Sequence, residues 1–429
     1  MTGIIVKPFK GYIPPESHIA EVIAPPYDVL NREEASEMGK EKPDCVIHIT
    51  RPEIEFPGVE STHPQVYQRG ADNLEKWISN KLFVQRDKPG FYAYRQHLGD
   101  HQQCGIFALC SLEQYKSGMI KKHEETRKAP EEDRTITTRI QNSNVGSVFL
   151  AYRSNENQEV SEYVRKLCSG IPNRASHLDF DNTDHELWFI EDEQEVNEVV
   201  RLFGTIDKLY IADGHHRCAS AYNVYEERKA AAGDDFKGDE PFCYFMAAIF
   251  ADTELCVIDY NRIITNVTMK TDDLIQRITE NGFKVSPYTG EEEPITHTFL
   301  KFHHARPINL HTFSMYLRGK WFKLDFVGKF LTDKPVDQID SKILTDFILS
   351  PIFGIEDLRS AKNIMFVGGT RDIHGLEEEA GTDDRIAFAI PPIQIHQLFD
   401  VSDSGAIMPP KSTWFVPKLA TGMVIRKIE

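Results

Sequence analysis

The stretch Leu209-Tyr-Ile-Ala-Asp-Gly-His-His-Arg-Cys-Ala-Ser-Ala-Tyr222 is the most informative part of this chain. Its apolar start, Leu209 to Ala212, predicts a buried strand, and its end, Cys218 to Tyr222, has the composition of a helix. Asp213-Gly214 separates the two patterns, as a turn would. A strand that turns at glycine into a helix directs backbone N–H groups and the positive end of the helix dipole toward one point.

The turn itself gathers groups that recognise an anion. Asp213, Gly214, His215, His216 and Arg217 are consecutive. Two imidazoles and a guanidinium supply hydrogen-bond donors, and a carboxylate lies at the edge. Solvated histidines on an ordinary strand–turn–helix are the plain alternative. No further cysteine or histidine follows at the short spacing of a zinc site, so zinc is not indicated and any metal is unknown. We predict a phosphate site here.

Composition limits the class of protein. The chain has 429 residues, of which 41% are hydrophobic and 27% charged, as in ordinary soluble globular proteins. This length predicts two or three domains. With 49 basic and 66 acidic residues the formal net charge is −17, which argues against a nucleic-acid partner bound through a broad basic face.

The sequence contains no membrane or secretion signal. No apolar run is long enough to span a bilayer, and the N-terminal residues lack the layout of a signal peptide. Seven scattered cysteines without a Cys-x-x-Cys pair favour free thiols. We therefore expect a cytoplasmic protein with no membrane partner.

Helix and strand patterns alternate, which predicts a mixed α/β (α+β) fold. Helices are expected over residues 64–84, 217–230, 271–281 and 339–349. Strands are expected over residues 46–50, 90–94, 103–109, 147–152, 186–190 and 241–250. A hairpin is expected from strands 312–317 and 320–326, with its turn at Arg318-Gly319.

We divide the chain into four parts on the basis of these patterns. They are an N-terminal α/β region (1–105), a core with both charged motifs (106–265), an α+β C-terminal domain (266–385) and a tail that returns to the core (386–429).

The segment from Ile120 to Arg134 is the most strongly charged part of the chain and the second candidate site. Glu124 follows His123, so a carboxylate suited to general-base chemistry adjoins an imidazole, and Arg134 adds positive charge. Alternating charges on an exposed helix are the plain alternative. Pro130 argues against a long regular surface helix. Solvated face and functional site both stay open.

Lys411, Ser412 and Thr413 form the third candidate, after a Pro-Pro turn and before Trp414-Phe415. A lysine with two hydroxyl groups can contact phosphate, but no Gly-x-x-x-x-Gly-Lys loop precedes it. A buried Trp-Phe anchor with an exposed lysine is the plain alternative.

Short motifs are spread in order over the whole chain: Lys7-Pro-Phe-Lys-Gly-Tyr12, Pro25-Pro-Tyr-Asp28, Arg51-Pro-Glu53, Lys122-His-Glu-Glu-Thr126, Glu132-Asp-Arg134, Asp213-Gly-His-His-Arg217, Asn261-Arg262 and Met408-Pro-Pro-Lys-Ser-Thr-Trp-Phe415. As a set they resemble the uncharacterised microbial family numbered 1015 among the domains of unknown function. The turn at Asp213 is also similar to the phosphate-binding element of the ParB and sulfiredoxin-like superfamily, and most to that of the free-serine kinases. This resemblance implies a ParB/sulfiredoxin-like nucleotide-binding core with an added α+β domain.

The resemblance to free-serine kinases also implies roles for single residues. Those enzymes hold nucleotide phosphates on such a turn and activate the serine hydroxyl with an upstream glutamate. That glutamate best matches Glu124, with Glu125 as the competitor, although about 90 residues separate it from the turn here. Sulfinic-acid repair is not implied, because the catalytic cysteine of sulfiredoxin falls within its turn, where this chain has histidines.

The expected site residues fall into three groups. Catalysis is assigned to Glu124, Asp213 and His123. Substrate contacts are assigned to Glu125 and Thr126. Phosphate or nucleotide binding is assigned to Gly214, His215, His216, Arg217, Arg134, Lys411, Ser412 and Thr413.

The implied function is phosphoryl transfer between a nucleotide and a small hydroxyl substrate. Serine and O-phosphoserine are the first candidate pair, and the direction is open. The expected cofactor is ATP or ADP with Mg²⁺, with Asp213 near the ion. The alternative is a ParB-like switch that binds or hydrolyses a nucleotide to act on a partner, although the acidic charge disfavours its DNA-loading form. A homodimer is left open.

Overall fold

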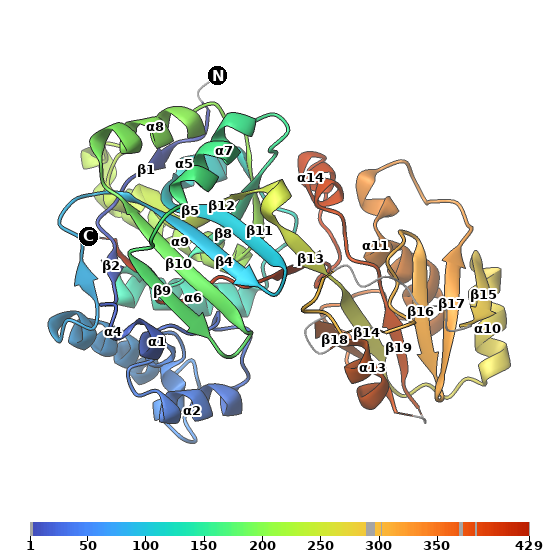
Figure 1. The fold of residues 1–429 in the computed structure, drawn as a ribbon. Helices are drawn as coiled ribbons and strands as arrows, with labels where there is room; N and C mark the ends of the chain where they lie inside the picture. Colours follow the sequence, from blue (N-terminus) through green and yellow to red (C-terminus); the bar gives the residue numbers. More distant parts are fainter. Residues whose placement is uncertain (1–2, 289–296, 302, 369–371, 382–383, 429) are drawn as a thin grey trace. The chain divides into compact units, whose positions relative to one another are not determined.

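The structure is a computed structural model that describes residues 3–288, 297–301, 303–368, 372–381 and 384–428. It confirms the mixed α/β class. The chain forms two compact units (Figure 1). The first unit contains Met1–Lys121, Glu125–Leu255 and Pro417–Glu429, and the second contains Lys122–Glu124 and Cys256–Val416.

A mixed sheet is the centre of the first unit. Within the described residues it has nine strands in the order β6-β11-β8-β12-β5-β4-β10-β9, with β1 also paired to β5. Strand β11 runs parallel to β6 and antiparallel to β8, and β12 runs parallel to β8. The strands are β1 (Val6–Lys7), β4 (Phe91–Leu98), β5 (His101–Ser111), β6 (Ile120–Lys121), β8 (Val148–Tyr152), β9 (Arg174–Leu178), β10 (Thr183–Ile190), β11 (Leu209–Asp213) and β12 (Tyr244–Ala251).

The central strands are apolar because both of their faces are covered. Every residue of β8 is buried, as are all but the first residue of β12. A strand covered on both sides has a continuous apolar run instead of alternation. The sheet packs with helices α5 (Leu112–Lys116), α7 (Gln158–Leu167), α8 (Glu193–Phe203) and α9 (His215–Ala232) into one core.

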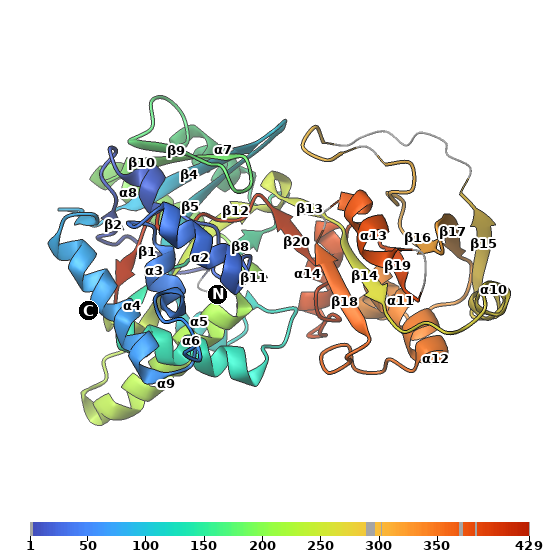
Figure 2. The ribbon, with the colours of Figure 1, turned by 90° about the horizontal axis from the view of Figure 1, so that it is seen from below.

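A second group of helices in this unit comes mainly from the N-terminal segment. They are α1 (Ile19–Val22), α2 (Arg32–Glu41), α3 (Ile47–Thr50), α4 (Pro64–Ser79) and α6 (Lys128–Gln141). Helix α6 packs along α9, and the two lie side by side in Figure 2. Two short strand pairs complete the unit: β2 (Tyr12–Ile13) with β3 (Val84–Gln85), and β7 (Ser143–Asn144) with β21 (Arg426–Lys427).

The second unit has its own sheet and core. The described part of its main sheet has six strands in the order β15-β17-β16-β19-β14-β18. They are β14 (Tyr260–Ile264), β15 (Phe283–Pro287), β16 (Thr312–Leu317), β17 (Lys320–Phe326), β18 (Ile364–Gly368) and β19 (Ile386–Ala389). The other elements are β13 (Cys256–Ile258), β20 (Trp414–Val416), α10 (Thr271–Glu280), α11 (Asp340–Leu344), α12 (Ser350–Phe353), α13 (Asp372–Ala380) and α14 (Ile395–Asp403).

Several element predictions are confirmed and two are corrected. The hairpin 312–326 turns at Arg318-Gly319, both with positive φ (49° and 79°), as a two-residue hairpin turn requires. The strand expected over 46–50 is wrong, because Ile47–Thr50 is helix α3. The helix expected over 64–84 ends at Ser79, and strand β3 follows it. Among the described residues, no helix has both the length and the apolar character needed to cross a membrane.

Candidate functional site

The turn at Asp213 has the predicted strand–turn–helix form. Strand β11 ends at Asp213, and α9 begins at His215. Gly214 between them has φ +91°, a left-handed conformation that glycine adopts without strain. Its carbonyl accepts the first helical hydrogen bond, from the Cys218 backbone N–H at 3.0 Å. The N-terminus of a helix of 18 residues therefore starts directly at the turn.

Asp213 is held as an anion by its surroundings. Its Oδ1 accepts a hydrogen bond from the Gly214 N–H at 2.9 Å. Its Oδ2 lies 3.1 Å from Nζ of Lys418 and 3.9 Å from Nη2 of Arg217. Burial opposes ionisation, but the charges of Lys418 and Arg217 prevail and hold the pKa of Asp213 well below its ordinary value.

Arg217 folds back over the turn and has one unsatisfied donor. Its Nη1 donates to the carbonyl oxygen of Ser147. Its Nε is buried and has no hydrogen-bond partner among the described residues. A Cβ placed on Gly214 would lie 3.1 Å from this Nε, so the guanidinium lies against the glycine. A buried N–H without a partner is costly unless a ligand or water accepts from it.

A narrow cavity of about 60 Å³ lies beside the turn. Sixteen described residues line it, and its charged side chains are Arg134 and Arg217, with no carboxylate. Ser143, Ser220 and Thr137 are also among the lining residues. The Oγ of Ser143 is buried and has no hydrogen-bond partner among the described residues. Two guanidinium groups and unsatisfied donors without an acid fit a small anion such as a phosphoryl group.

Arg134 reaches this cavity from helix α6, where sequence analysis expected positive charge. Its Nε and Nη2 donate to Oδ2 of Asp133 at 2.8 and 2.6 Å. Its guanidinium lies over the ring of Tyr27, 4.3 Å from the ring centre. Burial disfavours its charge, but Asp133, Tyr27 and Glu53 outweigh burial and raise the pKa of Arg134. The cation is thus fixed in place and permanently charged.

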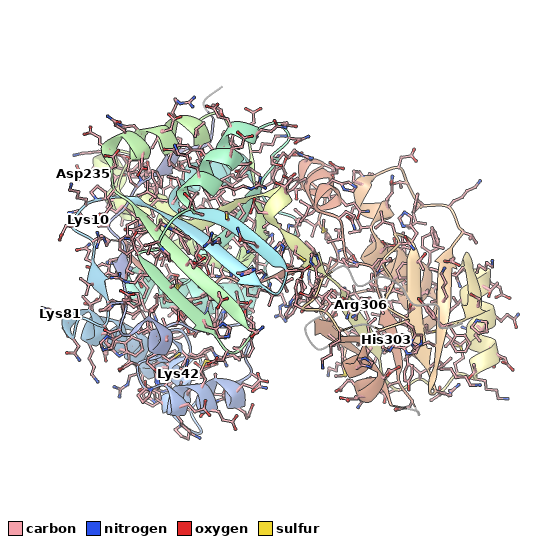
Figure 3. The ribbon with its side chains drawn as sticks, viewed as in Figure 1. Lys10, Lys42, Lys81, Asp235, His303 and Arg306 are labelled. Carbon is pink, nitrogen blue, oxygen red and sulfur yellow. The ribbon has the colours of Figure 1, made fainter. Side chains whose placement is uncertain are left out.

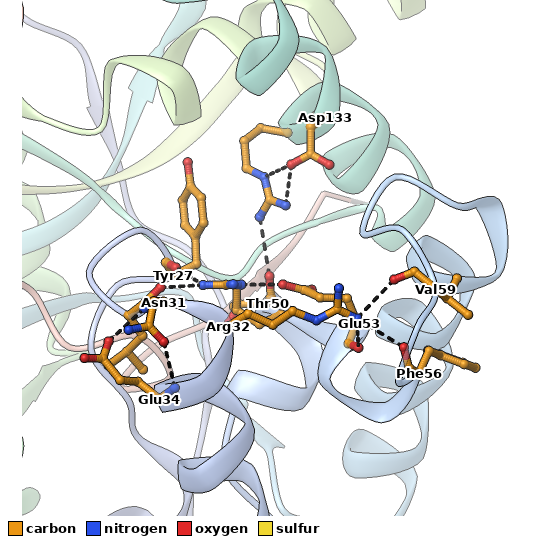
Figure 4. Close-up of polar contacts among 12 residues, drawn as sticks. Tyr27, Asn31, Arg32, Glu34, Thr50, Glu53, Phe56, Val59 and Asp133 are labelled. Carbon is orange, nitrogen blue, oxygen red and sulfur yellow. Dashed lines mark hydrogen bonds and ion pairs between the residues drawn. The ribbon is translucent and has the colours of Figure 1, made fainter. Parts of the chain in front are cut away.

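A wide cavity of about 240 Å³ adjoins the narrow one. The two share the lining residues Tyr27, Arg134, Thr137 and Gln141. Figure 4 shows Tyr27, Thr50, Glu53 and Asp133 in this region with their polar contacts. This cavity was not predicted from the sequence, although its lining includes residues of three of the quoted motifs: Pro25–Asp28, Arg51–Glu53 and Glu132–Arg134.

His216 and Thr126, two residues predicted to contact ligand, have structural partners, and their predicted roles stay predictions. Nε2 of His216 accepts a hydrogen bond from the backbone N–H of Arg127, which precedes α6, at 3.1 Å. Thr126 donates to Oε2 of Glu131 on α6. Both contacts fix the start of α6, so at least one polar atom of each residue is engaged within the fold.

His215 and Glu125 belong to the first unit, and His215 is buried. Neither residue lines the narrow or the wide cavity. Their assigned roles in phosphate and substrate binding stay predictions.

The other predicted residues belong to the second unit. His123 and Glu124 lie in its Lys122–Glu124 segment, and the carbonyl of His123 accepts from the Met408 N–H at 2.8 Å. The expected roles of His123 and Glu124 stay predictions.

Lys411, Ser412 and Thr413 also belong to the second unit. Lys411 has φ +61°, and its carbonyl accepts from buried Arg262 at 2.8 Å. The Ser412 hydroxyl contacts the hydroxyl of Ser341 at 2.7 Å. Phosphate binding by these three residues stays a prediction.

Lys418 is the tail residue that sequence analysis missed. It pairs with Asp213, and its carbonyl accepts a hydrogen bond from Nε2 of buried Gln96 at 2.8 Å. Gln96 in turn accepts from Gln103 at 2.7 Å. Such buried amides are costly unless paired, so they hold the tail in place. The only signal in the sequence is a second lysine seven residues after Lys411.

The residues of the turn do not fit a magnesium ligand set. Mg²⁺ prefers oxygen ligands free of competing cations, but Asp213 already faces the ammonium of Lys418 and the guanidinium of Arg217. A divalent ion would have to displace one of these cations. We therefore assign no chemistry to a metal at this turn.

A set of side chains that could ligate a metal lies in the second unit, where Figure 3 labels His303. His303, His374 and Glu377 bring ligand atoms within 4.8 Å of one another. Nδ1 of His303 accepts from the Ala305 N–H at 3.1 Å, which places the proton of a neutral ring on Nε2, 3.3 Å from Glu377. Trp321 donates to the same carboxylate at 2.6 Å. The set is satisfied as a hydrogen-bond cluster.

Comparisons with known proteins place the chain in a family. A family model described as "Protein of unknown function (DUF1015)" matches residues 6–342. No curated protein sequence matches the chain.

The chain is also similar to solved structures at low identity. A mutant free serine kinase in complex with ADP is 13% identical, with 74% of this chain and 90% of that chain covered and a TM-score of 0.35. A conserved hypothetical protein from Pyrococcus furiosus is 16% identical, with 75% and 95% covered and a TM-score of 0.32. SbnI with a C-terminal truncation, from Staphylococcus aureus, is 8% identical, with 73% and 85% covered and a TM-score of 0.34.

Proposed function

The chain belongs to the DUF1015 family of proteins of unknown function, and we propose that it is a phosphotransferase. It would move a phosphoryl group between a nucleotide, ATP or ADP, and a small hydroxyl substrate. Serine and O-phosphoserine are the first pair to test. The observation that carries the proposal is the narrow cavity, whose charged lining residues are Arg134 and Arg217, together with the buried Nε of Arg217, which has no hydrogen-bond partner among the described residues.

The cavity offers what phosphoryl transfer needs most. Negative charge in the transition state is spread over three phosphoryl oxygens, and catalysis consists mainly of positioning and charge stabilisation. Arg217 and Arg134 supply two guanidinium groups whose positions are fixed by the Ser147 carbonyl and by Asp133. Arg217 itself lies in the first turn of α9, at the positive end of the helix dipole.

The transfer has one bond made and one broken at phosphorus. The substrate hydroxyl oxygen forms a bond to phosphorus while the bond from phosphorus to the nucleotide's leaving oxygen breaks. The hydroxyl proton passes to a carboxylate, and we assign this role to Glu124, with Glu125 as the alternative. His123 is assigned as its neighbour, and Asp213 is assigned to fix Arg217.

The test is transfer by the purified full chain. With ATP, Mg²⁺ and serine, or with ADP, Mg²⁺ and O-phosphoserine, we expect phosphoryl transfer measurable by ³¹P NMR. Arg217→Ala is expected to lower kcat/KM at least 100-fold, because one fixed cation of the phosphate cavity is lost. Arg201→Ala, on the exposed side of α8, is the matched control and should leave the rate unchanged.

Two outcomes would contradict the proposal. Absence of transfer in both directions, with nucleotide still bound, would instead favour the nucleotide-dependent switch. If Arg217→Ala leaves kcat/KM for phosphoryl transfer unchanged, the turn is not part of the phosphate site. Retained activity in Glu124→Gln would shift the proton acceptor to another carboxylate.

A further inference from the structure

The wide cavity is the part of the first unit that the proposed function leaves unused. It adjoins the phosphate cavity and shares Tyr27, Arg134, Thr137 and Gln141 with it. Any molecule bound there would therefore lie next to a phosphoryl group held by Arg134 and Arg217. This is the position that the acceptor of a phosphoryl group must occupy.

The lining of the wide cavity is polar and charged. Its apolar members are Leu30, Pro52 and Val66, whereas the other ten lining residues are Tyr27, Asp28, Arg51, Glu53, Ser61, Tyr67, Asp133, Arg134, Thr137 and Gln141. Pockets for the flat apolar face of a nucleobase have mainly hydrophobic and aromatic walls. This lining instead suits a small molecule with several charged or hydroxyl groups.

The charges of the wide cavity leave one carboxylate without a cation. Arg51 pairs with Glu53 at 2.5 Å, and Arg134 pairs with Asp133 at 2.6 Å. Tyr67 donates to the other oxygen of Asp133 at 2.7 Å. Asp28 is exposed and has no ion pair or hydrogen bond among the described residues. Three carboxylates and two guanidinium groups therefore leave one negative charge, which a substrate ammonium would balance.

Arg51 provides a complementary anchor for an anion in the same cavity. Its Nε is committed to Glu53, and its Nη1 donates to the carbonyls of Tyr27 and Leu30 at 2.9 and 2.7 Å. Its Nη2 has no partner among the described residues. The two carbonyl bonds also tie Arg51 to the turn that carries Asp28. A free guanidinium edge and a free carboxylate among the lining residues of one cavity match a zwitterion.

Tyr27 lies where the two cavities meet. Its ring lies under the guanidinium of Arg134, and its hydroxyl has no hydrogen-bond partner among the described residues. Burial raises the pKa of Tyr27 to about 12, so the hydroxyl keeps its proton at neutral pH. A protonated phenol at this boundary can hold the substrate hydroxyl toward the phosphoryl group.

We propose that the wide cavity is the acceptor subsite and that it selects a hydroxylated amino acid. The ammonium group of the substrate pairs with Asp28, its carboxylate binds Nη2 of Arg51, and its hydroxyl lies beside Tyr27. The inference rests on the proposed function, and it names the feature of the substrate that the protein recognises. The substrate must carry both charges as well as the hydroxyl.

Binding of three small molecules to the full chain without nucleotide tests this assignment. Serine carries all three groups, glycerate lacks the ammonium, and ethanolamine lacks the carboxylate. We expect calorimetric titration to detect serine, and to find glycerate and ethanolamine at least tenfold weaker. Asp28→Asn should weaken serine at least tenfold while ADP affinity stays within twofold, because Asp28 lies outside the phosphate cavity.

A control variant and a separate measurement of phosphoryl transfer distinguish the acceptor subsite from the proposed phosphotransferase activity. Glu33→Gln changes an exposed acid of neighbouring helix α2 and should leave serine affinity unchanged. Glycerate bound as tightly as serine, or Asp28→Asn without effect, would overturn the acceptor assignment while phosphoryl transfer could still be measured with other alcohols. Serine bound through Asp28 without any phosphoryl transfer would support the subsite and contradict the phosphotransferase.

Discussion

Gly214 is the residue of the turn that tolerates substitution least. Its φ of +91° disfavours any side chain, and a Cβ would lie 3.1 Å from Nε of Arg217. We expect Gly214→Ala to lower the free energy of unfolding by about 1–3 kcal/mol and to weaken ADP binding, because Arg217 must move. Gly354→Ala is the control, since φ is +66° there but no atom lies within 4 Å of the Cβ. Equal ADP affinity in both variants would contradict a role for the close approach of Gly214 and Arg217 in ADP binding.

Asp213 should make stability depend on pH in one direction. Its cationic neighbours hold its pKa in the folded protein below that of the unfolded chain. The contribution of Asp213 to the free energy of unfolding is therefore complete above the ordinary aspartate pKa of about 4, and it is lost as the pH falls below that pKa. We expect the difference in unfolding free energy between wild type and Asp213→Asn to be constant from neutral pH to about pH 5 and to shrink in more acidic solution. A difference that grows toward acid would contradict this assignment.

The residues of the turn could be predicted from sequence, but their partners could not. Asp213, Gly214 and Arg217 lie within five consecutive residues, so their chemistry is visible in the local sequence, where strand, glycine and helix are adjacent. Lys418 reaches Asp213 across 205 positions, and its approach depends on buried Gln96. No local pattern contains that information.

Among the short elements, β21 shows how the C-terminal segment is fixed. Buried Arg426 on this strand donates to the carbonyl of Tyr244 at 2.6 Å and to that of Pro241 at 2.5 Å. Burial lowers its pKa to about 10, so it stays charged at neutral pH. We expect Arg426→Met to cost about 2–4 kcal/mol in chemical denaturation, because buried carbonyls lose their donor.

Lys427→Met on the same strand is the control for this change. Lys427 pairs with exposed Glu75, and surface pairs contribute little, about 1 kcal/mol or less. Similar losses of stability in the two variants would mean that the buried bonds of Arg426 add nothing.

Elements were predictable where periodicity and turn chemistry agree. The hairpin of β16 and β17 combines apolar strands with a glycine turn, and it forms as expected. Residues 46–50 alternate in sequence, but Ile47, Ile49 and Thr50 are all buried in helix α3. A run of five residues is too short for its alternation to distinguish a strand from a buried helical turn. Pro130 was expected to prevent a regular helix, yet it lies in the first turn of α6, where its missing N–H costs nothing.

At the scale of the molecule, the net charge is negative, whereas the charged residues that line the narrow cavity are positive. The chain carries a formal net charge of −17, yet its narrow cavity has two arginines and no acid. Net charge argued against a broad nucleic-acid surface but gave no indication of this local anion site. The wide cavity was also beyond sequence analysis, because Asp28, Arg51 and Asp133 meet only through packing of α6 against the N-terminal segment.

A crystal structure of the full chain with ADP tests the central claim most directly. The claim is that the turn at Gly214 and the narrow cavity form a phosphate site. We predict a phosphate of ADP within hydrogen-bond distance of Nε of Arg217 and Oγ of Ser143, the two buried atoms that have no partner among the described residues. ADP bound elsewhere, with Nε of Arg217 and Oγ of Ser143 still without a hydrogen-bond partner, would contradict this claim.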